Sequence, residues 1–169
     1  MSTQDTRAPQ GREQAWRSPD GDAPAPGRLV AVTDNPIGRA VVAIGEIAGR
    51  RTTLLADEGV EHMPVQWLAE HPLDEADAVV LCDHDTPEME GLLRAALDGK
   101  AGYVAMMGSR RRAEMVFAML DDLPEETLQR LRVPAGLNTG GKLPGEIALS
   151  VVAEVIAWCH GRDGGPMKR

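Results

Sequence analysis

Residues 29–56 read LVAVTDNPIGRAVVAIGEIAGRRTTLLA, and the spacing of their apolar side chains changes twice. Residues 29–33 are a short apolar run, which is typical of a buried parallel strand. Residues 36–48 repeat Val and Ile at helical spacing, and Gly49 suits the end of a helix. Residues 52–56, TTLLA, read as a second strand. A strand, a helix and a strand within about 30 residues predict a β-α-β unit and therefore a parallel sheet.

The same alternation continues along the chain. Apolar runs predict two further strands, at 78–82 and 103–107. Helices are expected near 67–69 and 89–97, and at 109–120, 124–131 and 142–160. Strands that alternate with helices predict an α/β fold with a three-layer, doubly wound, mainly parallel sheet. Ligands of such sheets bind beyond the carboxyl ends of the strands.

The chain is expected to contain one domain and two tails. Residues 1–27 contain no Leu, Ile, Val or Phe. They cannot bury enough apolar surface to offset the entropy of ordering, so we expect a disordered tail. Residues 28–160 form the predicted domain, and residues 161–169 a flexible C-terminal tail.

Composition excludes several classes of protein. The net charge of −8 argues against a nucleic-acid partner, because nucleic-acid-binding domains usually carry a basic balance. Cys82 and Cys159 lie in apolar runs and are expected to be buried free thiols in a reducing compartment. No apolar run reaches the ~18 residues that a membrane span needs, and the N-terminus lacks the apolar core of a signal peptide. We therefore expect a cytoplasmic protein with no membrane partner.

The first predicted strand-to-helix turn reads TDNPIG, residues 33–38. A dinucleotide site would have G-x-G-x-x-G here, so that the backbone can approach the pyrophosphate. Only Gly38 remains of the three glycines, and Asp34 adds a negative charge. This turn argues against NAD(P). The alternative is that Gly38 allows close packing of helix and strand.

Three further segments carry polar side chains to the expected ligand edge. Residues 83–85, Asp-His-Asp, could supply a general base or part of a metal site, or could cap a helix and fix the loop. Gly108 and Ser109 precede three arginines, 110–112, in a predicted first helical turn. Each cation there costs about 0.3–1 kcal/mol unless an anion compensates, so a bound phosphate is expected. The alternative is that these arginines point outward and pair with the many acids of the chain.

A glycine-rich loop precedes the last predicted helix. It contains Gly136, Asn138, Gly140 and Lys142. Free backbone N–H groups before a helix would suit another anionic group, whereas Glu146 could instead cap its own helix. We expect the body of this helix to be buried in the core or to form a dimer surface.

Three sequence blocks resemble one known family. Residues 103–111, YVAMMGSRR, and 134–154, PAGLNTGGKLPGEIALSVVAE, are similar to two signature blocks of the XdhC/CoxI family of xanthine dehydrogenase accessory factors. Residues 79–85, VVLCDHD, resemble a strand end of that family, with His84 on the family histidine. The resemblance extends over about residues 29–158 and concerns only the C-terminal, Rossmann-like domain of the family.

The resemblance implies an accessory, chaperone-like protein for a molybdenum-cofactor-dependent hydroxylase or dehydrogenase of the xanthine or CO dehydrogenase type. The implied ligand is anionic and phosphate-bearing, either the molybdenum cofactor with its pterin phosphate or a nucleotide. The implied partners are hydroxylase subunits, and a homodimer is possible. We assign no catalytic residue and no metal. The expected ligand-binding residues are Gly108, Ser109, Arg110, Arg111, His84, Asp85, Gly136, Asn138, Gly140 and Lys142. Two alternatives remain, a small NAD(P)-binding oxidoreductase and a ligand-free Rossmann-like interaction module.

Overall fold

The structure, a computed structural model, describes residues 26–56, 64–85 and 88–167. The predicted tail at 1–27 therefore lies almost wholly outside the described residues. In the described part, five parallel strands form one sheet in the order β2-β1-β3-β4-β5. Their bounds are β1 Leu29–Val32, β2 Thr52–Leu55, β3 Ala78–Leu81, β4 Tyr103–Met106 and β5 Leu131–Arg132.

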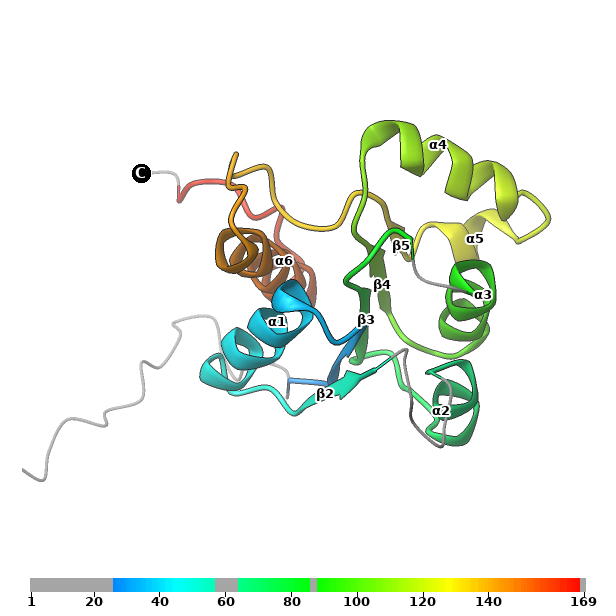
Figure 1. Ribbon diagram of the computed structural model, residues 1–169, viewed down its shortest axis with the longest axis horizontal. Coiled ribbons are helices and arrows are strands. Elements are labelled where there is room, and N and C mark those ends of the chain that lie inside the picture. The colour runs from blue at the N-terminus through cyan, green and yellow to red at the C-terminus, as the bar shows by residue number, and fades with distance from the viewer. Residues whose placement is uncertain (1–25, 57–63, 86–87, 168–169) are drawn as a thin grey trace, which may run out of the picture.

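Helices cover both faces of the sheet (Figure 1). One face carries α1 (Pro36–Ile47) and α6 (Pro144–Cys159). The other carries α2 (Pro64–Glu70), α3 (Met89–Asp98), α4 (Arg110–Met119) and α5 (Glu125–Leu128). The predicted three-layer, parallel α/β fold is confirmed.

Alternate side chains of the strands build the two cores. Val30 and Val32 pack into the core under α2, α3 and α4, whereas Leu29 and Ala31 pack into the core under α1 and α6. Successive side chains of a strand point to opposite faces, so a strand buried on both faces needs a continuous apolar run. β1, β3 and β4 show this pattern, whereas β2, at the edge of the sheet, reads TTLL and is mostly half-buried.

The register brings the carboxyl ends of four strands to one edge. Leu29 is level with Thr52 on one side and with Ala78 on the other, and Ala78 is level with Tyr103. The strand ends that meet at this edge are Val32, Leu55, Leu81 and Met106. The described turns that follow Val32, Leu81 and Met106 therefore begin side by side, as predicted.

The region after α4 differs from the prediction. A single helix was expected at 124–131, but α5 ends at Leu128 and the chain enters a fifth strand at Leu131. β5 pairs with β4 through Val104–Leu131 and Ala105–Arg132. Two residues are too short for an apolar run to stand out, and the pairing depends on a neighbour distant in sequence. Pairing with β4 therefore overrode the local helical pattern.

No helix in the described part of the chain is long and apolar enough to cross a membrane. The sequence likewise contains no apolar run long enough for a membrane span.

One buried carboxylate joins the starts of two strands. Asp77, which directly precedes β3 and is 1% exposed, accepts hydrogen bonds from the Arg28 N–H (2.6 Å), from the Arg28 guanidinium (2.8 Å) and from the Asp74 N–H (3.0 Å). Burial opposes ionisation, but these hydrogen bonds outweigh it and hold the pKa of Asp77 below its usual value. The residue before β1 and the residue before β3 are thus held together by an ion pair.

We expect Asp77→Ala to lower the free energy of unfolding by about 3 kcal/mol, because it leaves two N–H groups without an acceptor and removes the carboxylate that pairs with the Arg28 guanidinium. Since the folded pKa of Asp77 is lowered, its contribution is present above about pH 4 and is lost as the pH falls through the folded value. Urea denaturation of both proteins at pH 7 and pH 3 measures this. Asp98→Ala, at an exposed carboxylate of α3, is the control and should change stability by less than about 0.5 kcal/mol. An equal loss at both pH values would contradict the assignment.

Candidate functional site

A cleft of about 920 Å³ lies beyond the carboxyl ends of β3 and β4. Its walls are the start of α4, residues 134–142 and one side of α6. In Figure 1 this loop runs from β5 to α6 between the two helices. The lining residues are Ile37, His84, Met107, Gly108, Ser109, Arg110, Arg112, the loop 134–142, Ile147 and Ser150. The site is thus at the edge of the sheet where the topology predicts a ligand.

Most of the predicted site residues line this cleft. These are His84, Gly108, Ser109, Arg110, Gly136, Asn138, Gly140 and Lys142. Two predicted residues, Arg111 and Asp85, are not among its lining residues. Arg111 is exposed on α4, and Asp85 accepts a hydrogen bond from the Arg112 guanidinium at 3.0 Å. Arg112 lines the cleft in place of Arg111, so the structure divides the three arginines between two directions.

The charge of the cleft is opposite to the charge of the chain. Arg110, Arg112 and Lys142 line it, and no Asp or Glu of the described ranges does. The whole chain carries a net charge of −8. Clefts lined by one sign of charge concentrate ligands of the opposite sign. The cleft is therefore a local cationic region of an acidic protein, and its lining favours an anionic ligand.

The start of α4 adds backbone donors to these cations. Ser109 is the N-cap, and its hydroxyl oxygen accepts from the Arg112 N–H at 3.2 Å. Within the described part of the chain, the N–H groups of Arg110 and Arg111 have no recorded acceptor. The first N–H groups of a helix have no intrahelical partner, and the helix dipole makes this end positive. Ser109 and Arg110 are therefore placed to hold an oxyanion.

Two N–H groups just before α6, unlike the first N–H groups of α4, have an acceptor within the protein. The Glu146 carboxylate accepts from the Lys142 N–H at 2.9 Å and from the Leu143 N–H at 3.1 Å. The Leu143 and Lys142 bonds hold the pKa of Glu146 below its usual range. Of the two alternatives predicted for this helix start, the structure therefore shows the second, in which Glu146 caps its own helix. These two N–H groups are not free for a ligand, and α6 faces the cleft with Ile147 and Ser150.

In the first strand-to-helix turn, the side chain of Asn35 makes hydrogen bonds to the protein backbone. The Asn35 amide oxygen accepts from the Gly38 N–H at 2.8 Å, and the Asn35 amide nitrogen donates to the Cys82 carbonyl at 2.9 Å. A Cβ on Gly38 would collide with the Thr33 carbonyl oxygen. Gly38 therefore serves the close packing of β1 and α1, and Asn35 ties this turn to the end of β3.

The Asp-His-Asp cluster forms part of the rim of the cleft. His84 Nε2 lies 3.2 Å from an Asp85 oxygen, and His84 Nδ1 lies 3.7 Å from Asp83. One donor atom from each of the three lies within 4.8 Å of the others, a spacing that a cation could bridge. Asp85 is also paired with Arg112, which competes for the same carboxylate. These contacts tie the end of β3 to α4, as the loop-fixing alternative proposed.

The apolar lining residues were not predicted from the sequence. Ile37, Met107, Leu137 and Ile147 supply aliphatic and thioether surface beside the cations. The only signal for Ile147 and Ser150 was their spacing of three on one helix, which places them on the same face. A ligand that fits this cleft has an anionic group and a less polar body.

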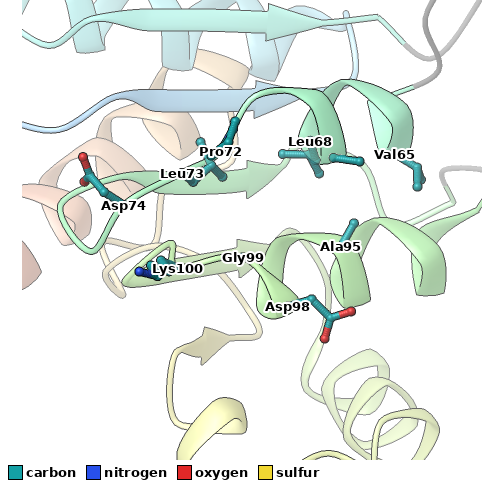
Figure 2. Close-up of a pocket in the computed structure, with 10 residues that line it drawn as sticks. Val65, Leu68, Pro72, Leu73, Asp74, Ala95, Asp98, Gly99 and Lys100 are labelled. Atoms are coloured by element: carbon teal, nitrogen blue, oxygen red, sulfur yellow. The ribbon is translucent and has the colours of Figure 1, made fainter.

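A second cavity, of about 680 Å³, lies between α2 and α3. Figure 2 shows Val65 and Leu68 of α2 facing Ala95 of α3, with Asp74 and Lys100 toward one end. Its lining is mainly aliphatic and includes two carboxylates, Asp74 and Asp98. It lies toward the amino ends of β3 and β4, since residues 72–74 and 98–100 precede those strands. An anionic ligand therefore favours the first cleft.

Fold and cleft together define a Rossmann-like domain with a cation-lined cleft at the carboxyl edge of its sheet. Residues 29–155, more than half of the chain, match the XdhC Rossmann domain. The chain belongs to the XdhC family, as its signature blocks indicated.

Two curated proteins share this region. The uncharacterized protein YqeB of Escherichia coli (strain K12) is 30% identical over 95 residues, which cover 55% of this chain and 17% of that protein. A probable xanthine dehydrogenase subunit of Bacillus subtilis (strain 168) is 28% identical over 101 residues, which cover 60% of this chain and 29% of that protein. The chain therefore matches less than a third of the length of either relative.

A solved structure shares the fold. The crystal structure of a xanthine dehydrogenase from Bacillus halodurans superposes with a TM-score of 0.65 at 23% identity. The superposition covers 82% of this chain and 44% of that one. At this identity the likeness concerns the fold alone.

Two glycines of the loop provide a test of its packing. Gly136 has φ +97°, and a Cβ there would lie 2.5 Å from the Ser150 hydroxyl oxygen. Gly140 has φ +77°, and a Cβ there would meet nothing within 4 Å. We expect Gly140→Ala to lower the free energy of unfolding by about 1 kcal/mol, from backbone conformation alone. Gly136→Ala should cost roughly 2 kcal/mol more, because it also overpacks the contact with α6. Urea denaturation decides this, and equal losses would mean that the loop does not pack on α6 as described.

Proposed function

We propose that the protein is an accessory factor for a molybdenum-dependent hydroxylase or dehydrogenase, and that the cleft binds a phosphate-bearing ligand. The observation that carries the ligand half is the lining of the cleft, with three cations and no carboxylate among the described residues of a strongly acidic chain. Membership of the XdhC family and the name of the Bacillus subtilis relative support the dehydrogenase half.

The residues present fit a phosphate at one end of the cleft. Arg110 and the hydroxyl of Ser109 would hold it, together with the free N–H groups at the start of α4. Lys142 would add a positive charge from the glycine loop. Hydrogen bonds between charged groups are stronger than neutral ones, at about 1.5–3 kcal/mol each. The phosphate would therefore supply much of the binding energy, as expected for an ion held on a helix N-terminus.

The rest of the cleft fits a flat, partly polar body. Ile37, Met107 and Ile147 provide an apolar wall, whereas Asn138 and Thr139 provide hydrogen-bonding groups. The cavity of about 920 Å³ lies within the range of roughly 300–1,000 Å³ that is typical of small-molecule sites. We therefore favour the molybdenum cofactor, held by its pterin phosphate, over free phosphate. When bound, this group would supply the molybdenum chemistry of the partner enzyme, and the protein would bind and orient it.

The partner in this proposal is one of the subunits of a molybdenum hydroxylase. A homodimer through α6 belongs to the same proposal. Leu149 and Ile156 are 58% and 38% exposed, and seven residues apart they lie on one face of the helix.

Arg110 and Arg111 form a matched pair for testing the ligand site. We expect Arg110→Ala to weaken the binding of pyrophosphate and of molybdenum cofactor about ten-fold, because it removes a charge-assisted hydrogen bond in the cleft. Arg111→Ala should change the affinity less than about two-fold, since Arg111 does not line the cleft and its more distant charge is screened by salt. Isothermal titration calorimetry measures both variants.

Two results would contradict the ligand half of the proposal. One is that the unmodified protein binds neither pyrophosphate nor molybdenum cofactor at high micromolar concentration. The other is that Arg111→Ala weakens binding as much as Arg110→Ala. Saturable binding of NADH with no binding of the pterin would instead favour the oxidoreductase alternative.

A further inference from the structure

We infer that Glu154 is a positioning residue of the cleft, because its carboxylate fixes the first residue of the glycine loop. Glu154 is not among the residues that line the cleft. It acts through Gly136, whose N–H donates to a Glu154 oxygen at 2.7 Å. The effect on ligand affinity rests on the proposed function, whereas the effect on the loop does not.

Three successive N–H groups fix the start of the loop. The Ala135 N–H donates to the Met106 carbonyl at 2.9 Å, which joins the loop to β4. The Leu137 N–H donates to the Ser150 carbonyl at 3.2 Å, which joins it to α6. Only the middle N–H, that of Gly136, is held by a side chain. This bond is therefore the one that a substitution of the acceptor can remove without changing the backbone.

The Glu154 carboxylate is itself held in place. The same oxygen accepts from the Tyr103 hydroxyl at 2.5 Å. Tyr103 is 1% exposed, and its ring packs against Trp158 with 5.5 Å between centroids. Burial and the neighbouring Glu154 raise the pKa of Tyr103, so its hydroxyl stays protonated and remains a donor. A buried strand residue thus fixes the carboxylate, and the carboxylate fixes the loop.

A positioning role of Glu154 and a purely electrostatic effect of its charge predict opposite changes in anion affinity when the carboxylate is removed. A carboxylate behind an anion site disfavours the bound anion, so its removal should strengthen anion binding if charge alone acts. If Glu154 instead holds the loop in place, its removal lets Gly136 and the residues after it leave the cleft wall, and anion binding weakens. The sign of the change therefore separates the two.

The test titrates four variants with inorganic pyrophosphate by calorimetry. We expect Glu154→Ala to bind about ten-fold more weakly than the unmodified chain, because the loop loses a hydrogen bond to a charged acceptor. Glu154→Gln keeps an oxygen acceptor and should bind within about two-fold. Glu154→Asp keeps the charge but shortens the reach, so it should weaken binding as well. Glu114→Ala removes one exposed carboxylate from α4 and should bind no more weakly than the unmodified chain.

Amide hydrogen exchange of Gly136, measured by NMR without ligand, is the second readout. Its N–H should be protected in the unmodified chain and in Glu154→Gln, and should exchange at least about ten-fold faster in Glu154→Ala. If Glu154→Ala does not fold, Glu154→Asp takes its place in both measurements.

The inference is overturned if Glu154→Ala and Glu154→Asp bind pyrophosphate as tightly as the unmodified chain, or if Gly136 exchanges equally in all variants. If the unmodified chain binds no pyrophosphate, the ligand half of the proposed function fails. The exchange of Gly136 then decides the inference alone.

Discussion

The partners of the backbone N–H groups around the cleft decide what this domain can bind. An N–H group that already has an acceptor within the protein is not available to a ligand, whereas one without an acceptor can bind water or a ligand. Carboxylates of α6 hold the N–H groups of Gly136, Lys142 and Leu143, and the Asn35 amide holds that of Gly38. At the start of α4 a hydroxyl holds only the third N–H of the helix, that of Arg112. The start of α4 therefore keeps two N–H groups, those of Arg110 and Arg111, without an acceptor among the described residues, which supports the proposal that an anion binds there.

The same hydrogen bonds bear on the proposal that this acidic protein binds an anion. The carboxylates close to the cleft are already engaged, with Asp85 on Arg112 and with Glu146 and Glu154 on backbone N–H groups. Arg110 and Lys142, by contrast, line the cleft. A carboxylate that accepts hydrogen bonds keeps its negative charge but offers fewer free lone pairs to the cleft. Some carboxylates of the acidic chain thus help to build the walls of the cleft, while the side chains of Arg110 and Lys142 line it without a carboxylate partner among the described residues.

Most of the fold could be predicted from the sequence because its strands β1, β3 and β4 are buried on both faces. Such strands need unbroken apolar runs, which stand out at residues 29–33, 78–82 and 103–107. β5 could not be predicted, because Leu131–Arg132 becomes a strand only by pairing with Val104 and Ala105 of β4. A pairing of only two residues with a strand distant in sequence leaves no recognisable pattern in the local sequence.

The site was predicted to the level of segments but not of side chains. The turns at residues 84, 108–110 and 136–142 follow from parallel strands whose ends share one edge. Which arginines face the cleft depends on the rotation of α4, and each residue turns a helix by about 100°. Residues 110, 111 and 112 therefore cannot all face one way, and only Arg110 and Arg112 of the three line the cleft. The role of Glu154 was hidden for a similar reason, since its partners Tyr103 and Gly136 are brought to it only by packing.

The most direct test of the central claim is a crystal structure of this chain grown with pyrophosphate. We expect the anion at the start of α4, within hydrogen-bond distance of the Arg110 N–H and its guanidinium, with the Glu146 and Glu154 contacts unchanged. An anion bound instead at the Asn35–Gly38 turn, or at the start of α6 with Glu146 displaced, would contradict the claim.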